Sequence, residues 1–418
     1  MAMTSSPGWG AVRRIGFRFG FIVGALVVFP FPIGAIPRTD DLATTLGKPF
    51  EWAGTWLAQD VLGIADPPNV MTGSGDRTFD YVQLLLIASI GVLGTIVWSI
   101  ADRRRRSYPR LAAGSIVVLR YVLGQAMLSY GFSKIFKLQF PDLQPGRLEE
   151  RIGEMSPMGL VWTFMGHSRP YTMFAGFAEE IGGALLFWRR TATIGALVLV
   201  PVMTNVVLLN FCYDVPVKIY STELLIMAVV IASPSVRRLI GAALGRAVAE
   251  VPPRARMSRL AEWTRRIAAL ALTAGIAAGL YAQFSDRPDV NARGHELYGT
   301  WIVDTFTANG VEHPPLTTDP DRWRVCVFNA HNLGLRPMAG KGQGFPIEVD
   351  ARAGTIALTV DRATKRQETW RYTRPGSDHL VIDAVHGGAY LHVTLHPEPE
   401  PLLTSRGFHW INEIPFNR

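Results

Sequence analysis

Seven stretches of this chain are long and apolar enough to form helices that cross a lipid bilayer. Such a helix needs about 20 predominantly apolar residues, with a tolerated range of roughly 17 to 25. The stretches lie at 15–36, 81–100, 113–136, 171–188, 192–212, 217–235 and 266–284. The composition agrees, because 48% of the residues are hydrophobic and only 18% are charged. We therefore predict an α-helical polytopic membrane bundle that ends near residue 284.

The distribution of basic residues predicts how this bundle is oriented. Arginine and lysine gather before residue 15 and at 101–110, 189–191 and 236–265, whereas the loop at 37–80 holds seven acidic and three basic residues. Positively charged loops stay in the cytoplasm. We expect a cytoplasmic N-terminus and a periplasmic or extracellular C-terminal region in a bacterial inner membrane. The first stretch is predicted to be a retained helix, because its apolar core is longer than that of a cleaved signal.

The net charge of +8 does not by itself predict a nucleic-acid partner. A nucleic-acid-binding chain typically shows a basic face interleaved with aromatic residues, or a recognisable motif, and this sequence shows neither. The apolar stretches instead predict the lipid bilayer as the main partner. A membrane or periplasmic protein is the candidate second partner.

After about residue 290 the pattern changes to strict alternation of apolar and polar residues, which is typical of β-strands. The alternating runs lie at 300–307, 323–329, 355–361, 368–373, 379–384 and 389–395, with glycine- and proline-containing turns between them. About eight short strands in series imply an antiparallel meander. An open meander would leave exposed edges, so we predict that 290–418 form an all-β barrel or sandwich.

Polar residues inside the apolar stretches are the candidate site. Inserting an ionisable group into hydrocarbon costs at least roughly 2.5 to 3.5 kcal/mol. Each such group is therefore expected to have a partner, a water-filled cavity or a function. Arg120, Met127 and Lys134 repeat at seven residues and therefore share one helix face. The candidate ligand-binding residues are Arg120, Tyr130, Lys134, Glu179, Glu180, Asn205, Asn210, Asp214, Lys218 and Glu223.

Two interpretations of these residues remain open. Most of them fall in the predicted outer half of the membrane, where they are able to share one pocket for a small polar or redox-active ligand. Alternatively, they form interhelical ion pairs that only fix the bundle, for example Lys134 with Glu180 and Asp214 with Lys218.

Other chemistry leaves weaker signals. Eight of the nine histidines lie in the C-terminal part, but no pair has helical metal-ligand spacing, so no metal site is predicted; His392 and His396 share the polar face of one strand. No nucleotide-binding loop, nucleophile elbow or paired-cysteine motif is present. The two cysteines, Cys212 and Cys326, are able to pair only if the β-domain sits on the fifth stretch.

Residues 111–235 resemble the DoxX-like membrane protein family. The resemblance rests on YGFSKIFKLQFP (130–141), SPMGLVWTFMG (156–166), GFAEEIGGALLFWRR (176–190) and TNVVLLNFCYDVPVKIYS (204–221). It implies a four-helix membrane module at 111–235. Around this module we expect two N-terminal helices with a long external loop (1–110), a basic cytoplasmic loop (236–265) and a last helix (266–284).

The family takes its name from a subunit of a thiosulfate:quinone oxidoreductase, so the resemblance implies a quinone-linked role, with quinone as the candidate cofactor. The external domain in turn is similar to a lipocalin-like barrel, in which an early tryptophan, here Trp301, packs beneath a late basic residue, here Arg406. The aromatic-rich closing segment 406–418 is expected to be ordered against the barrel or the membrane.

Three functional hypotheses follow. The first is a DoxX-type protein that binds a quinone or another small lipophilic ligand in the bundle. The second is a non-catalytic envelope protein whose barrel binds a lipid or a partner protein. The third is a carboxylase-like enzyme, because a membrane bundle with an external β-domain resembles the vitamin K-dependent carboxylase group in outline; Lys134 or Lys218 would then act as a base.

Overall fold

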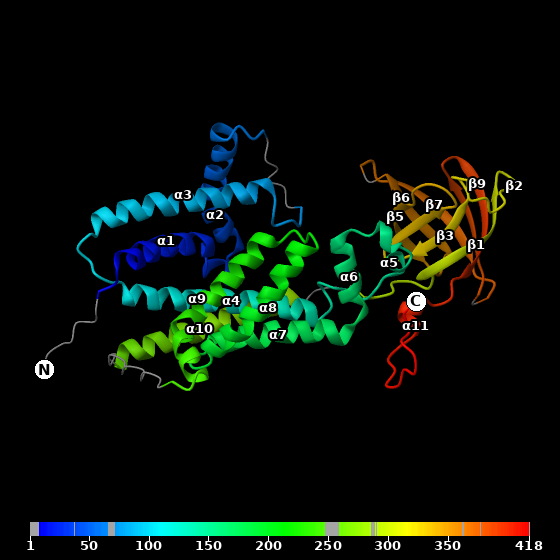
Figure 1. Ribbon diagram of the computed structural model, residues 1–418. Helices are drawn as coiled ribbons and strands as arrows, with labels where there is room; N and C mark the ends of the chain where they lie inside the picture. The colour runs from blue at the N-terminus through cyan, green and yellow to red at the C-terminus, as the bar shows by residue number, and fades with distance from the viewer. Residues whose placement is uncertain are drawn as a thin grey trace. The chain divides into compact units, whose positions relative to one another are not determined.

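The computed structural model describes residues 8–36, 38–65, 72–246, 259–285, 289, 291–361, 363–376 and 378–417. The chain divides into two compact units (Figure 1). The helical unit comprises Met1–Gln139 and Thr172–Pro288, and the barrel unit comprises Phe140–Tyr171 and Asp289–Arg418. The predicted order of helices followed by strands is therefore confirmed, but the boundary between the units is more complex than one linker.

Five helices are long and apolar enough to cross a membrane, at Thr78–Ala101, Pro109–Ile135, Ala192–Cys212, Lys218–Val236 and Glu262–Ser285. They belong to α3 (Thr78–Ala101), α4 (Pro109–Ile135), α8 (Ala192–Cys212), α9 (Lys218–Ala243) and α10 (Arg259–Ser285). Helices of this length and composition indicate a membrane protein. Shorter or more polar helices complete the unit, namely α1 (Ala11–Val28), α2 (Asp40–Trp56) and α7 (Arg169–Phe187).

The count of seven membrane spans was wrong for the described residues. The stretches at 15–36 and 171–188 do form helices, but α1 has only 18 residues and carries three arginines. Pro30 and Pro32 stand two and four residues beyond the end of α1, and proline cannot donate the backbone hydrogen bond that would extend a helix. Two glutamates and three glycines lower the hydropathy of α7.

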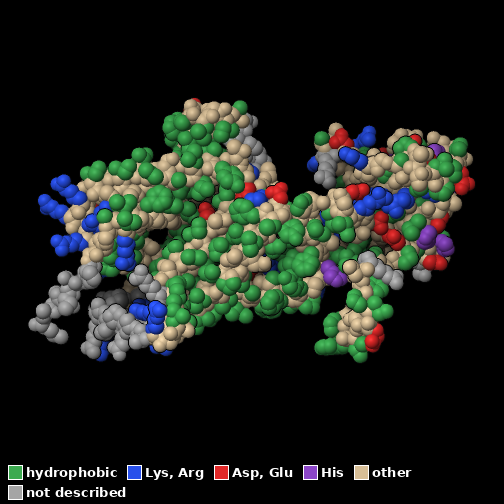
Figure 2. All heavy atoms as spheres, in the orientation of Figure 1, with side chains coloured by type: hydrophobic (Ala, Val, Ile, Leu, Met, Phe, Trp, Pro, Cys, Tyr) green, Lys and Arg blue, Asp and Glu red, His purple; other side chains and the backbone are tan. Residues whose placement is uncertain are grey.

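The N-terminal arginines lie beside the arginines that follow α3. The backbone N–H of Trp9 donates to the carbonyl of Arg106 at 3.0 Å, and a guanidinium nitrogen of Arg14 donates to the carbonyl of Arg105 at 3.3 Å. Figure 2 shows the resulting concentration of basic side chains at one end of the helical unit. Both basic segments therefore share one side of the bundle, as loops on one face of a membrane do.

Glycines bring α4, α7 and α8 into close contact. A Cβ atom added at Gly183 would lie 2.7 Å from the Cβ of Met127 in α4, and one added at Gly182 would lie 2.6 Å from Leu199 in α8. Real side chains do not approach this closely, so the missing side chains of these glycines let the three helices pack together. The predicted face of α4 is confirmed, because Arg120, Met127 and Lys134 are all buried.

The barrel is an antiparallel meander of eight strands, closed by pairing of β1 with β9. Its strands are β1 (Gly299–Ala308), β3 (Trp323–Phe328), β4 (Asn332–Pro337), β5 (Gln343–Asp350), β6 (Thr355–Asp361), β7 (Arg366–Thr373), β8 (Leu380–His386) and β9 (Ala389–Pro397), and the short β2 (Val311–Glu312) pairs with β1. All six predicted strands are confirmed. β4 and β5 were missed, because glycine and proline interrupt their alternation.

Large side chains fill the interior of the barrel. Trp370 is completely buried and stacks on Trp323 with ring centroids 5.4 Å apart, and Phe328 lies fully buried in the same core. Cys326 is also buried, which raises the pKa of its thiol. Both Cys212 and Cys326 are free thiols, so the pairing that the sequence left open is not formed.

The basic residue over Trp301 differs from the one expected. The guanidinium of Arg374, between β7 and β8, lies 5.5 Å from the centroid of the Trp301 ring, whereas Arg406 lies over Phe416 at 4.0 Å. Arg406 also donates to Asn412 at 2.7 Å, so the closing segment is held by its own contacts. Its apolar side chains remain exposed, and Trp410 is 91% exposed.

The predicted four-helix module at 111–235 is interrupted by a segment of the barrel unit. Residues Phe140–Tyr171 connect α4 to α7 in the chain, and they contain the short helices α5 (Pro145–Leu148) and α6 (Pro157–His167). The carboxylate of Glu149 accepts from Arg324 of β3 at 3.3 Å, and Gln144 accepts from Tyr298 at 2.9 Å. The bundle and the barrel are thus connected by three crossings of the chain.

Candidate functional site

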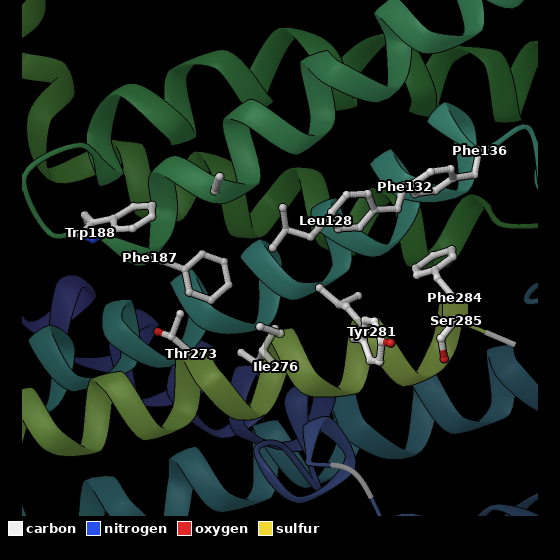
Figure 3. A pocket seen from close by; sticks show the side chains of 13 residues that line it. Leu128, Phe132, Phe136, Phe187, Trp188, Thr273, Ile276, Tyr281, Phe284 and Ser285 are labelled. Atoms are coloured by element: carbon white, nitrogen blue, oxygen red, sulfur yellow. The ribbon is translucent and has the colours of Figure 1, made fainter.

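The candidate site is an apolar cavity of about 530 Å³ in the helical unit, between α4, α7 and α10. Pockets that hold small molecules have volumes of roughly 300 to 1,000 Å³. Six of the lining side chains are aromatic, namely Phe132, Phe136, Phe187, Trp188, Tyr281 and Phe284. Figure 3 shows Phe132, Phe136 and Phe284 grouped at one end, and Phe187, Trp188 and Thr273 at the other.

The cavity is elongated along α10. Its lining residues on this helix run from Thr273 to Ser285, which corresponds to about 18 Å at 1.5 Å per residue. Ile276 and Leu280 are buried and pack α10 on Tyr121 of α4, so they form the floor of the cavity. Trp188 and Tyr281 are 63% and 75% exposed. The cavity is therefore open on the side where these two side chains lie.

The sequence signal for this cavity is the spacing of aromatic residues. Leu128, Phe132 and Phe136 recur at every fourth residue, and Tyr281 and Phe284 are three apart, so each set lies on one helix face. Such spacing is equally typical of an ordinary helix contact. The spacing alone therefore could not identify the cavity, because the cavity also depends on where α10 packs.

Lys134 and Glu179 form a buried ion pair between α4 and α7. The Nζ atom of Lys134 lies 2.7 Å from Oε2 of Glu179, and the two side chains are 8% and 3% exposed. The ion-pair interpretation of Lys134 is thus correct in kind, but its partner is Glu179 and not Glu180. Each charge satisfies the other, and the pair fixes the spacing of two helices that line the cavity.

Tyrosines extend this pair toward α9. The ammonium group of Lys134 lies 5.4 Å from the centroid of the Tyr130 ring, and the rings of Tyr130 and Tyr220 have centroids 6.2 Å apart. Glu223 follows Tyr220 by three residues on α9, which places both on one helix face. A series of polar and aromatic groups therefore extends across α4, α7 and α9. It includes four of the predicted residues, namely Tyr130, Lys134, Glu179 and Glu223.

Arg120 and Asn210 have structural partners. Nε of Arg120 donates to the carbonyl of Leu186 at 2.8 Å, which satisfies an otherwise unpaired group near the C-terminus of α7. The side-chain amide of Asn210 donates to the hydroxyl of Ser221 at 3.0 Å and so joins α8 to α9. Both residues are buried, and neither lines the cavity.

Asp214, Lys218 and Asn205 lie apart from the buried pair. Lys218 pairs with Asp214 at 2.8 Å, as one interpretation predicted, and lies 3.7 Å from Asp76. Asp76 also accepts from the first two backbone N–H groups of α9, at 2.8 and 3.0 Å. Asn205 is exposed on α8. Asp214 and Lys218 therefore have partners outside the buried pair, and one shared pocket stays a prediction for these residues.

Among the predicted site residues on α7, Glu180 shares a helix face with residues that line the cavity. It precedes Ala184 by four residues and Phe187 by seven, and both of these line the cavity, so Glu180 lies on the same face of α7. A Cβ atom at Gly131 of α4 would lie 3.0 Å from the Cβ of Glu180. None of the ten predicted residues is itself a lining residue. Glu180 thus lies on the cavity face of α7 without lining the cavity.

In the barrel unit, Glu398 has a raised pKa. Burial and the neighbouring carboxylate of Glu149 raise the pKa of Glu398 to about 7, against an ordinary value of 4.5, while Arg324 opposes the shift. One oxygen of Glu398 is buried without a hydrogen-bond partner among the described residues. The folded barrel unit therefore favours protonated Glu398.

We expect Glu398→Gln to remove a pH dependence of stability. Because the folded pKa is raised, the contribution of Glu398 is fully present below about pH 4.5 and is lost as the pH rises through about 7. At pH 8 the variant should be more stable by about 1 kcal/mol, discounted for the solvent that reaches this pair. Thermal unfolding between pH 4.5 and 8 measures the effect, with Glu400→Gln as the exposed control. Parallel pH profiles of the variant and the native protein would contradict the prediction.

Comparison with known proteins gives one informative relative. The uncharacterized protein YwoB of Bacillus subtilis (strain 168) is 35% identical to this chain over 112 residues, which are 27% of this chain and 71% of YwoB. No protein-family model matches the chain, and no solved structure matches it.

Proposed function

The chain belongs to the family of the uncharacterized protein YwoB, and since that name assigns no activity, we propose a function from the geometry of the cavity. The helical unit binds a small membrane-soluble lipophile that carries a flat ring, such as a quinone, between α4, α7 and α10. The observation that carries this proposal is an aromatic-lined cavity of about 530 Å³ that opens between apolar helices.

The lining supports a ring-bearing ligand over a plain acyl chain. Aromatic side chains prefer to pack on other aromatic rings in offset or edge-to-face geometry. Phe132 and Phe284 already adopt edge-to-face packing, with centroids 5.8 Å apart, and Phe136 lies 6.3 Å from Phe284. A ring that enters from the bilayer meets these three side chains at one end of the cavity.

Glu180 would contribute the polar contact. This residue shares the face of α7 that carries Ala184 and Phe187 of the cavity lining, whereas Glu179 is paired with Lys134. A ligand with a carbonyl or hydroxyl on its ring would place this group near Glu180 while its apolar part lies along α10. Selectivity for a ring with a polar substituent follows from this arrangement.

Filling the cavity tests the proposal. We expect Ala277→Trp, which places an indole in the cavity, to lower the amount of co-purified lipophile at least ten-fold. Mass spectrometry of organic extracts from the purified protein, with quinones and phospholipids quantified separately, measures the result. The matched control is Ala278→Trp, since Ala278 is the exposed neighbour and does not line the cavity.

The outcomes separate the parts of the proposal. Retention of quinone by both tryptophan variants would overturn this location, and recovery of phospholipid alone would overturn a ring-bearing ligand. Absence of any lipophile from the native protein, followed by failure of added menaquinone or ubiquinone to bind, would overturn the function itself.

The DoxX resemblance adds a redox role and an orientation to the proposal. In that form the bound ring is a quinone, the N-terminus is cytoplasmic, and the barrel unit is periplasmic or extracellular. The arginines gathered at one end of the helical unit support the orientation. The carboxylase hypothesis has less support, because Lys134 and Lys218 are both engaged by carboxylates.

The second candidate function assigns binding to the barrel. Its interior is filled by Trp323, Phe328 and Trp370, which leaves little support for a lipid inside it. The exposed closing segment, with Phe408 77% and Trp410 91% exposed, supports contact with another surface instead.

A further inference from the structure

A cleft of about 440 Å³, lined by both polar and apolar groups, lies wholly within the barrel unit. It is formed by residues from 141–144, 146–147 and 150, by Trp162 of α6 and by residues 329–332, which lead from β3 into β4. Figure 1 shows α5 beside β3, where this cleft is built. The cleft has a size suited to a small ligand and takes no part in the function proposed above.

Hydrogen bonds fix the two walls of the cleft to each other. The side-chain oxygen of Asn329 accepts from the backbone of Gly146 at 3.2 Å, and a Cβ at Gly146 would come within 3.2 Å of the amide nitrogen of Asn329. Asn291 accepts from the backbone of Asp142 at 2.8 Å. The cleft is therefore set by the folded barrel unit and does not require a ligand to form it.

The charges around the cleft are paired. Arg147 lies 2.5 Å from Glu150, and Asp142 lies 2.8 Å from Arg169. An anionic or cationic ligand would have to compete with these partners. A neutral ligand is able to use their remaining donor and acceptor positions without breaking a pair.

The unengaged groups favour a ligand rich in hydroxyls. His331 and Asn332 are exposed, and their side chains make no hydrogen bond to other described residues. An amide and an imidazole each offer a donor and an acceptor, as paired hydroxyls require. Trp162 is half-buried, with Phe140 packed on it at 5.0 Å, and its indole adds a flat apolar surface to the same cleft.

From these groups we infer that the cleft binds a neutral saccharide unit. Sugar hydroxyls match the amide, imidazole and carboxylate groups, and the C–H face of a sugar ring matches the indole of Trp162. Arg147, the arginine among the described lining residues, is paired with Glu150, so the balanced charge is the feature that selects a neutral ligand over a phosphate or a carboxylate.

The test uses the full chain in lipid nanodiscs and an array of neutral and acidic mono- to tetrasaccharides, with inorganic phosphate as a separate probe. We expect binding of at least one neutral saccharide. Asn332→Ala and Trp162→Leu should each weaken that binding at least ten-fold. Asn412→Ala and Trp410→Leu, which alter exposed residues far along the chain, should leave it unchanged.

Asn332 is exposed, so its variant tests the cleft even if Trp162→Leu fails to fold. Binding that Asn332→Ala does not weaken would overturn the proposal. Binding of no neutral saccharide, or of phosphate and acidic saccharides only, would overturn it equally. These results leave the lipophile cavity untouched, because none of the substitutions lies in the helical unit.

Discussion

Lys134→Met is expected to destabilise the helical unit by about 3–5 kcal/mol, since it leaves the buried carboxylate of Glu179 without its partner. Glu179 is 2% exposed and its side chain approaches no other cation among the described residues. Methionine keeps the length of the side chain and removes the charge. The free energy of unfolding, measured by SDS titration in mixed micelles, reports the loss.

The double variant Lys134→Met/Glu179→Leu distinguishes a scaffold from a binding group. If the pair only fixes the helices, the double variant should recover most of the stability, because an apolar pair of similar size replaces two charges. Lys48→Met, at an exposed lysine of α2, serves as the control and should change stability by less than about 0.5 kcal/mol. A loss below about 1 kcal/mol for Lys134→Met would show that the ion pair contributes little.

The amount of lipophile that these variants retain tests whether the buried ion pair also contacts the ligand. Glu180 lies on the face of α7 that carries Ala184 and Phe187 of the cavity lining, whereas Glu179 pairs with Lys134, although the two are adjacent in sequence. The double variant should therefore keep the lipophile, whereas Glu180→Gln should weaken its retention at nearly constant stability. The opposite pattern would move the polar contact from Glu180 to the buried pair.

The barrel strands were predicted well from the sequence, because apolar residues at every second position identify the face of a strand that is buried. Ile356 and Leu358 are fully buried, as their spacing required, and the same holds for Leu391, Val393 and Leu395 in β9, which are nearly or fully buried. The pattern of apolar runs was less decisive for the helices. It measures length and hydropathy, and so it did not separate α7, which carries two glutamates, from a span such as α8.

The site was harder to predict. Helix periodicity shows which residues share one face of a helix, but it does not show which residues of another helix that face contacts. The seven-residue repeat of Arg120, Met127 and Lys134 correctly gave a buried face of α4. It did not specify which glutamate Lys134 meets, since Glu179 and Glu180 differ by 100° around α7. The cavity depends on α10, whose position beside α4 follows from packing of Ile276 and Leu280 on Tyr121.

Trp370→Ala is expected to destabilise the barrel by about 3–5 kcal/mol, because it removes the largest fully buried side chain of that core. Trp323 would lose the ring on which it stacks, and the surrounding strands are hydrogen-bonded on both sides and relax only partly. Hydrogen exchange of the amides of β6, β7 and β8 measures the free energy of opening in the full chain. Trp410→Ala, at a 91% exposed position, should leave it within about 0.5 kcal/mol.

The cavity left by Trp370→Ala also tests the barrel as a binding domain. Indole should occupy it and restore about 1.4 kcal/mol when its concentration is ten times its dissociation constant. The native barrel should gain nothing from indole or from a fatty acid, because Trp370 and Trp323 already fill the interior. Stabilisation of the native barrel by either compound would show that the interior opens for a ligand. Binding would then belong to the barrel, and the helical unit would be its anchor.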